Sequence, residues 1–155
     1  MIQLGEPVRP IQILLVEDSP GDVRLTRECF KDAKIRVNLH VAGNGEEAIE
    51  FLNRSAADGH TPLPDLVLLD LNLPGMDGRE VLAIIKSDER FKRVPVVVLT
   101  ISKSEEDVLR SYDLHANCYI VKPIDFGQFV NVIRSIEDFW LTVVRLPTED
   151  RASQS

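Results

Sequence analysis

The sequence predicts a doubly wound α/β fold, a five-stranded parallel sheet with helices on both of its faces. Three short runs of mainly branched apolar residues are bounded by polar or turn residues, as strands are when helices cover both sides of a sheet. Those runs are residues 13–16, 66–69 and 96–99. Stretches with helical spacing separate them, and this alternation, together with right-handed crossovers, favours the strand order 2-1-3-4-5.

Two further segments complete the predicted sheet. Residues 37–41 alternate apolar and polar side chains. This alternation is typical of a strand with one face in water, and the order 2-1-3-4-5 places this second strand at an edge. Residues 118–121, with the sequence CYIV, supply the fifth strand. Residues 55–64 are mostly small, polar or proline, so we expect a long loop there, before the third strand.

The predicted helices begin with recognisable capping residues. Ser19 is the cap of the first helix and Pro20 occupies its first position, where the fixed φ of proline suits a helix. In the other helices a capping residue is followed three positions later by Glu or Gln, a pattern in which two side chains satisfy free backbone N–H groups. These pairs are Asn44 with Glu47, Asp77 with Glu80, Ser102 with Glu105, and Asp125 with Gln128.

Length, charge and composition limit the possible classes of protein. At 155 residues the chain has the size of one domain, and no apolar run approaches the ~20 residues of a membrane span. A net charge of −7 argues against direct binding of nucleic acid. Two cysteines and an N terminus without an apolar signal segment favour the cytoplasm. We expect an N-terminal extension over residues 1–10, one domain over residues 11–143, and a solvated tail over residues 144–155.

Polar residues follow four of the predicted strands where each strand ends. They are Glu17 and Asp18, Asp70, Thr100, and Lys122. The carboxyl ends of parallel strands lie along one edge of the sheet, and ligands bind there near the point where the strand order reverses. We therefore expect these side chains to converge. Each taken alone has a simpler interpretation: the acidic pair as solvated charges near a helix N terminus, Asp70 as a turn residue, and Lys122 as a surface lysine.

Three clustered carboxylates need a cation to offset their repulsion. Two unit charges about 4 Å apart repel by about 1 kcal/mol in water and by about 4 kcal/mol at an effective dielectric constant of about 20. Mg²⁺ prefers oxygen ligands and commonly binds one or two carboxylates together with phosphate oxygens. Asp18 and Asp70 suit direct ligation, Glu17 suits ligation through a water, and the backbone carbonyl of Asn72 completes the predicted set.

Beside a bound Mg²⁺, a carboxylate is able to act as a nucleophile toward a phosphoryl group and form an aspartyl phosphate. Asp70 is the predicted nucleophile because it ends the central strand. Lys122 is expected to pair with one phosphoryl oxygen, and the hydroxyl of Thr100 is expected to donate to another.

The residues of this predicted site lie in four segments that follow one another along the chain. They are residues 14–18 (LLVED), 68–78 (LLDLNLPGMDG), 98–100 (VLT) and 119–123 (YIVKP). Together they resemble the receiver domain of two-component response regulators, over residues 11–143. The resemblance implies a flavodoxin-like strand order, Mg²⁺-dependent phosphorylation of Asp70 by a sensor histidine kinase, and a switch pair formed by Thr100 and Tyr119.

The same resemblance implies that the protein is not an enzyme beyond its own phosphorylation and dephosphorylation. Because no output domain is expected after residue 143, the signal is expected to leave through protein contacts or through onward transfer of the phosphoryl group in a phosphorelay.

The C-terminal region carries a second, narrower pattern. Residues 114–119 (LHANCY) and 136–147 (IEDFWLTVVRLP) resemble the single-domain response regulators of bacterial and cyanobacterial phytochromes. That resemblance implies a light-sensing histidine kinase as the phosphodonor and a homodimer. The apolar arc of the last predicted helix is wider than contact with one sheet face requires, so we expect Phe139 and Trp140 in a dimer contact beside the fifth strand. A longer buried helix is the alternative.

One residue departs from the receiver pattern. Ile101 follows Thr100 directly, at a position where the family usually has a small residue. Its branched side chain is expected to narrow the access to Asp70 and to slow both phosphorylation and attack by water.

Three other functions share parts of this pattern. A flavodoxin-like electron carrier needs hydroxyls and glycines in its first loop, whereas residues 17–22 are acidic and would repel a phosphate. A Mg²⁺-dependent phosphatase with an aspartyl intermediate normally has a second acid two residues after its nucleophile, where this chain has Asn72. A phosphorylation-independent dimeric scaffold would keep its cellular effect after Asp70 is replaced by Asn.

Overall fold

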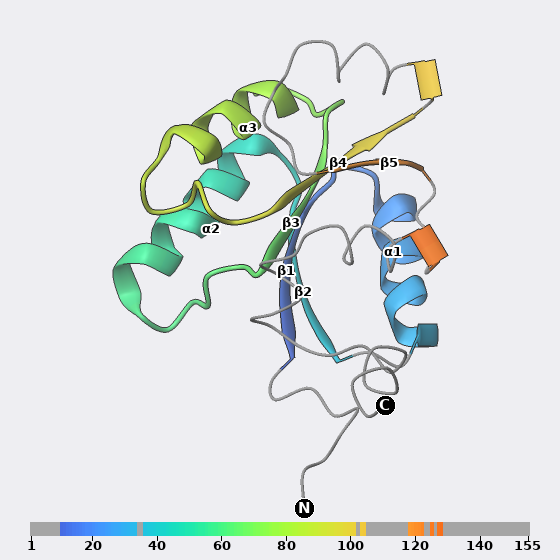
Figure 1. The fold of residues 1–155 in the computed structure, drawn as a ribbon, viewed down its shortest axis with the longest axis horizontal. Helices are drawn as coiled ribbons and strands as arrows, with labels where there is room; N and C mark the ends of the chain where they lie inside the picture. Colours follow the sequence, from blue (N-terminus) through green and yellow to red (C-terminus); the bar gives the residue numbers. More distant parts are fainter. Residues whose placement is uncertain are drawn as a thin grey trace, which may run out of the picture.

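A computed structural model describes residues 10–33, 36–101, 103–104, 118–122, 125 and 127–128. Within these residues five parallel strands form one sheet in the order β2-β1-β3-β4-β5, which confirms the predicted topology. The strands are β1 (Ile11–Val16), β2 (Val37–Ala42), β3 (Leu66–Asp70), β4 (Val96–Thr100) and β5 (Cys118–Val121). Figure 1 shows the sheet between α1 (Pro20–Ala33) on one side and α2 (Gly45–Asp58) and α3 (Gly78–Ser87) on the other. No helix among the described residues is long and apolar enough to cross a membrane.

The apolar side chains of the central strands are buried on both faces of the sheet. Alternate residues of β1, β3 and β4 form one cluster with α2 and α3. This cluster includes Leu14, Val16, Val67, Leu69, Val96 and Val98 from the strands and Phe51, Leu52, Val81, Leu82 and Ile85 from the helices. The intervening residues, such as Leu15 and Leu68, are fully buried and point to the opposite face, where α1 lies. Burying one such side chain contributes roughly 1.5–3 kcal/mol, so this packing holds the strand ends in fixed positions.

Capping residues start the helices largely as predicted. Asp77 and Glu80 form a reciprocal capping box at the start of α3. The Asn44 side chain accepts a hydrogen bond from the backbone N–H of Glu47 at 2.8 Å, but the Glu47 carboxylate accepts from Gly43, one residue before the cap. Two further predicted caps accept from the third residue that follows them: Ser19 from Asp22 at 3.3 Å, and Asp125 from Gln128 at 2.8 Å. The pair formed by Ser102 and Glu105 lies outside the described residues.

The prediction of a loop over residues 55–64 is wrong at its start. Helix α2 continues to Asp58 and is closed by Gly59, which adopts the left-handed backbone conformation with a φ of 70°. Residues 56 and 57 are alanines, which favour a helix. Ser55 stays helical because its hydroxyl donates to the carbonyl of Phe51 at 3.1 Å. The loop that leads to β3 therefore begins only after residue 58.

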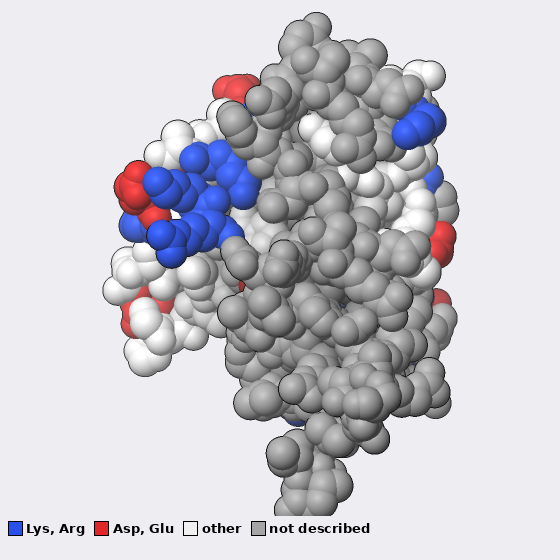
Figure 2. Space-filling model, viewed as in Figure 1, with Lys and Arg blue, Asp and Glu red and all other residues white. Residues whose placement is uncertain are grey.

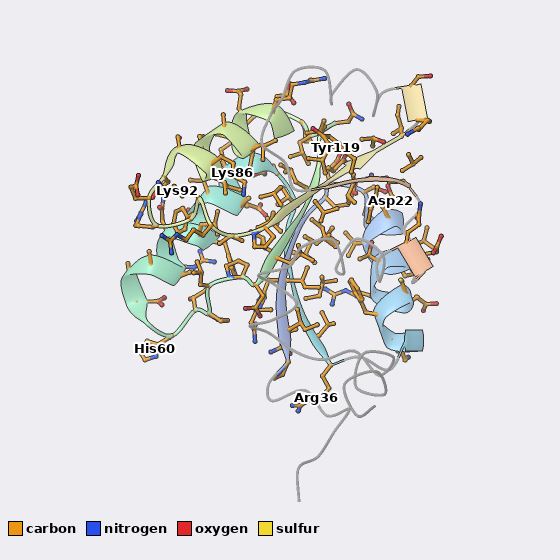
Figure 3. The ribbon with its side chains drawn as sticks, in the orientation of Figure 1. Asp22, Arg36, His60, Lys86, Lys92 and Tyr119 are labelled. Atoms are coloured by element: carbon orange, nitrogen blue, oxygen red, sulfur yellow. The ribbon has the colours of Figure 1, made fainter. Side chains whose placement is uncertain are left out.

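Lysine and arginine side chains gather on the surface beside the turn from α3 to β4 (Figure 2), where Figure 3 places Lys86 and Lys92. Lys86 Nζ donates to the backbone carbonyls of Lys92 and Val94 at 3.3 and 2.8 Å, and burial lowers the pKa of this lysine. Arg90 pairs with Asp88 at 2.8 Å. These cations therefore close the turn and help to fix the start of β4.

Helix α3 begins in contact with the backbone that follows β3. The N–H of Gly78 donates to the carbonyl of Leu71 at 3.2 Å. A Cβ at position 78 would lie 2.6 Å from the carbonyl oxygen of Asp70 and 2.6 Å from the Cα of Leu71, closer than van der Waals contact permits. The absence of a side chain at Gly78 therefore allows α3 to approach the end of β3.

Replacement of Gly78 by Ala is expected to lower the free energy of unfolding by about 1–3 kcal/mol, the usual cost of forcing extra volume into packed structure. Chemical denaturation of the parent and of Gly78→Ala measures the difference. Gly21→Ala is the matched control, because the nearest atom to a Cβ at Gly21 is the Ser19 hydroxyl oxygen at 3.9 Å. Equal stability of the parent and Gly78→Ala would show that the contact is not restrictive.

Candidate functional site

The carboxyl ends of β1 and β3 bring acidic side chains together. Glu17 and Asp18 follow β1, and Asp70 is the last residue of β3. One carboxylate oxygen from each of these three residues lies within 4.8 Å of the others. Glu17 and Asp70 are buried, each with 3% of its surface exposed, whereas Asp18 is exposed. The structure therefore brings together the three predicted carboxylates and holds two of them in the interior.

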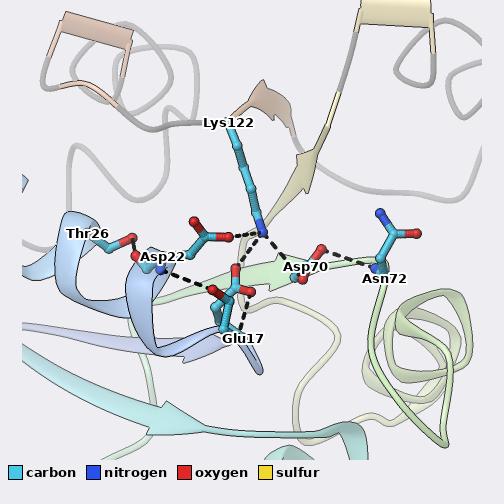
Figure 4. A network of polar contacts seen from close by, with 7 residues as sticks. Glu17, Asp22, Thr26, Asp70, Asn72 and Lys122 are labelled. Atoms are coloured by element: carbon cyan, nitrogen blue, oxygen red, sulfur yellow. Dashed lines mark hydrogen bonds and ion pairs between the residues drawn. The ribbon is translucent and has the colours of Figure 1, made fainter.

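The ammonium group of Lys122 enters this cluster from the end of β5. Its Nζ lies 2.7 Å from Glu17 Oε1, 2.9 Å from Asp22 Oδ2 and 3.4 Å from Asp70 Oδ2 (Figure 4). The side chain is only 16% exposed, so the interpretation of Lys122 as an ordinary surface lysine is wrong. Its backbone N–H donates to the carbonyl of Thr100 at 2.8 Å, which ties the residue after β5 to the end of β4.

The two carboxylate oxygens of Asp70 have different neighbours. Oδ1 accepts a hydrogen bond from the backbone N–H of Asn72 at 3.1 Å, and Oδ2 faces Lys122. The contact with Asn72 is a turn contact of the kind that the simpler interpretation of Asp70 predicted. Asp70 therefore shapes its own loop and belongs to the acidic cluster at the same time.

Burial changes the protonation of the cluster. Desolvation is the main reason why the pKa of Glu17 rises to about 7; the charge of Asp70 adds to this effect and the ion pair with Lys122 opposes it. Burial disfavours the ammonium form of Lys122, but the hydrogen bonds to Glu17 and Asp22 and the charge of Asp70 outweigh it and raise the pKa of Lys122. Lys122 is therefore a cation throughout the neutral range, whereas Glu17 exchanges a proton within that range.

The two residues predicted as a switch pair lie on neighbouring strands. Thr100 ends β4 and is fully buried, and Tyr119 of β5 is partly buried and packs against the core cluster beneath α2 and α3. The pairing of β4 with β5 sets Tyr119 opposite Val98, so Tyr119 and Thr100 point to the same face of the sheet. Ile101, directly after β4, is 65% exposed. Phe139 and Trp140, the residues predicted for a dimer contact, lie outside the described residues.

The donor set of the cluster fits a hard divalent cation. The converging side chains of Glu17, Asp18 and Asp70 offer only carboxylate oxygens, and Mg²⁺ prefers oxygen ligands over nitrogen and sulfur ligands. With Asp22 included, the site contains four carboxylates and one ammonium group, which leaves three negative charges when all the acids are ionised. A dication therefore suits both the chemistry and the charge of the cluster.

Asp22 is a residue of the site that was not among the predicted ones. Asp22 lies in the first turn of α1, where acids are common because the helix dipole favours them, so its local sequence does not distinguish it. Its contact with Lys122 joins residues 100 positions apart. Only the fold, which places the start of α1 beside the end of β5, reveals this contact.

Known proteins are similar to this chain in sequence over most of its length. The response regulator receiver domain matches residues 13–134 of the chain. Response regulator Rcp1 of Synechocystis sp. is 48% identical over 138 residues, which cover 89% of this chain and 94% of Rcp1.

Two solved structures are similar to the chain as a whole. The bacteriophytochrome response regulator AtBRR has a TM-score of 0.78 at 40% identity, and the match covers 85% of this chain and 96% of AtBRR. The Mn²⁺-bound form of Rcp1 has a TM-score of 0.65 at 48% identity, and the match covers 89% of this chain and 99% of Rcp1. Because the family match spans most of its length, the chain belongs to the response regulator receiver domain family and is related to the response regulators of phytochromes.

Proposed function

We propose that this chain is a phosphorylation switch that accepts a phosphoryl group on Asp70 from a sensor histidine kinase. The observation that carries the proposal is the placement of the Asp70 carboxylate at the end of the central strand. One oxygen is held by the N–H of Asn72, and the other faces the ammonium group of Lys122. A carboxylate held beside a fixed cation is well placed to attack an anionic phosphoryl group.

Mg²⁺ is the cofactor that we propose for this reaction. Asp18 and Asp70 would bind it directly, Glu17 through a water, and Asn72 through its backbone carbonyl. When bound, Mg²⁺ neutralises charge on the phosphoryl oxygens. The convergence of three carboxylates and the existence of a Mn²⁺-bound form of the relative Rcp1 support a divalent cation here.

The side chains of the site divide the work of phosphoryl transfer. An oxygen of Asp70 forms a P–O bond while the P–N bond of a phosphohistidine donor breaks. The imidazole leaves with the bonding electron pair and takes up a proton. Lys122, which stays charged at neutral pH, pairs with one phosphoryl oxygen, and the hydroxyl of Thr100 donates to another. Attack of water on the aspartyl phosphate releases inorganic phosphate and returns the free carboxylate, so the reactions proposed here are the chain's own phosphorylation and dephosphorylation.

The modification changes the local charge and thereby the preferred conformation. A phosphoryl group adds about −1.5 to −2 charges, and we propose that Thr100 and Tyr119 respond to it together. Their positions on one face of adjacent strands support this coupling. Couplings of this kind usually amount to about 1–3 kcal/mol, so phosphorylation shifts a population between two states and does not convert it completely.

We propose a light-sensing phytochrome kinase as the donor, since AtBRR and RcpA are described as response regulators of phytochromes. The receiver would span residues 11–143 and act in the cytoplasm as a homodimer. The dimer would form through the last helix, with Phe139 and Trp140, and through β5. The signal would pass to another protein by contact or by onward phosphotransfer, without binding of nucleic acid or membrane.

Incubation with acetyl phosphate and Mg²⁺ is expected to add one phosphoryl group to the parent and none to Asp70→Asn, because an amide is a poor nucleophile. Intact mass spectrometry measures the modification. Asp77→Asn is the control, since Asn also caps a helix well, and it is expected to be modified like the parent. Light scattering of the same samples and of Trp140→Ala measures their mass in solution. A monomeric mass for all of them would contradict the proposed homodimer. Equal modification of the parent and Asp70→Asn would refute the proposed acceptor.

The affinity for Mg²⁺ is expected to rise with pH through the neutral range. The folded-state pKa of Glu17 is raised from 4.5 to about 7, so below pH 7 a cation must displace a proton from this carboxyl group. For a single group of this pKa, the apparent Kd falls about tenfold between about pH 6 and about pH 8. Calorimetric titration measures the change. Glu17→Gln is expected to bind more weakly and with little pH dependence, and a parent Kd that is constant over this range would contradict the role of Glu17.

Replacement of Ile101 by Ala is expected to shorten the half-life of the phosphorylated protein about threefold, because a smaller side chain beside Thr100 opens the path of water to Asp70. An effect of this size corresponds to about 0.6 kcal/mol in the barrier. The half-life is measured by loss of the phosphoryl mass after the donor is removed. Ile84→Ala, at an exposed position of α3, is the control and is expected to match the parent. Equal half-lives for all three proteins would show that Ile101 does not restrict the access of water to Asp70.

A further inference from the structure

Asp22 contributes a fourth carboxylate to the site. It reaches Lys122 from helix α1, on the more solvent-exposed side of the lysine. Its Oδ2 lies 2.9 Å from Lys122 Nζ, and the pair joins the first turn of α1 to the end of β5 (Figure 4). The Asp22 side chain is 39% exposed, compared with 2% for Glu17 and 4% for Asp70. Among the described residues, the three acids whose oxygens converge as a candidate metal site are Glu17, Asp18 and Asp70. Asp22 therefore acts on the lysine and stands apart from the other acids.

The local structure of α1 directs the Asp22 carboxylate toward Lys122. After the cap Ser19, Asp22 is the third helical residue, from which an acidic side chain commonly reaches back to the N–H of the cap. That N–H instead donates to Glu17 Oε2 at 3.3 Å. The backbone of Asp22 is held on both sides, because its N–H donates to the Ser19 hydroxyl and its carbonyl accepts from Thr26 at 2.9 Å. The carboxylate is thus not used for capping, and a fixed backbone presents it to the lysine.

The three contacts of Lys122 are unequal. Its Nζ is closer to Glu17 and Asp22, at 2.7 and 2.9 Å, than to Asp70, at 3.4 Å. An ammonium group has three N–H donors and each must be directed at one acceptor. The ammonium group therefore lies closer to the acids of β1 and α1 than to the proposed phosphoacceptor, although it still contacts Asp70.

On the basis of the proposed phosphoryl transfer, we infer that Asp22 is a positioning residue that holds the Lys122 ammonium on the α1 side of the site and thereby slows transfer to Asp70. An N–H directed at Asp22 is not available to a phosphoryl oxygen at Asp70. The charge of Asp22 also weakens the attraction of the ammonium group for an anionic donor. Without Asp22 the lysine keeps its contact with the buried Glu17, so it stays in the site and moves toward Asp70.

The test compares the rates at which acetyl phosphate modifies the parent and Asp22→Asn, each at a Mg²⁺ concentration that saturates that protein. Asp22→Asn is expected to react about fivefold faster, the change that corresponds to the loss of a partly exposed ion pair of about 1 kcal/mol. Asp22→Glu keeps the charge and is expected to retain the parent rate. Glu28→Gln removes the same charge from an exposed position on α1 and is expected to leave the rate unchanged.

A second measurement distinguishes two possible causes of the faster reaction: loss of the direct contact with Lys122, and a change in the long-range electrostatic field of the protein. The rate ratio of Asp22→Asn to parent is expected to persist at about 0.5 M salt, because partly buried pairs are screened less than exposed charges. Asp22→Ser, with a small polar side chain at the same helical position, provides a second variant with the same expected acceleration.

Three results would overturn the inference: an Asp22→Asn rate no higher than that of Glu28→Gln, an equal acceleration in Asp22→Glu, or loss of the rate ratio in high salt. In each case a parent that is still modified at Asp70 leaves the proposed function intact. A parent that takes up no phosphoryl group overturns the proposed function itself.

Discussion

One ammonium group offsets part of the negative charge of the site, and the arrangement of the sheet brings it there. Lys122 contacts Glu17, Asp22 and Asp70, which come from three different parts of the chain. Removing one partner from a buried, hydrogen-bonded ion pair typically costs about 3–5 kcal/mol, so buried acids at these positions depend on the lysine. The strand order β2-β1-β3-β4-β5 places β5 two strands from β3, close enough for a long side chain to cross the end of β4.

The charged end of the sheet is possible because the rest of the sheet is apolar. Strands β3 and β4 are buried along their whole length, and the polar residues Asp70 and Thr100 occupy only their last positions. The close packing of the apolar residues fixes the backbone, and it thereby fixes the positions of the polar residues at the strand ends. The desolvation that raises the pKa of Glu17 is a cost of this arrangement. In return, the charges interact in a medium where each of them has a stronger effect than in water.

Much of the fold could be predicted from local patterns, because each pattern reports a constraint that acts on neighbouring residues. Apolar runs identified the strands, and Asp77 with Glu80 identified the start of α3. The convergence of Glu17, Asp18, Asp70 and Lys122 followed from the topology, since parallel strands end along one edge. The end of α2 was missed because serine occurs in loops as well as in helices, where its hydroxyl can donate to a backbone carbonyl of the preceding turn. Asp22 was missed because its partner is set by tertiary structure, which no spacing along the chain encodes.

The close contact at Gly78 makes the start of α3 and the end of β3 a single stiff unit. The helix cannot move nearer to Asp70, because backbone atoms are already in contact there, and moving away would break the hydrogen bond from Gly78 to Leu71. The first turn of α3 and the backbone after Asp70 are therefore held at a fixed separation. The geometry around the Asp70 carboxylate thus depends on a residue that has no side chain of its own.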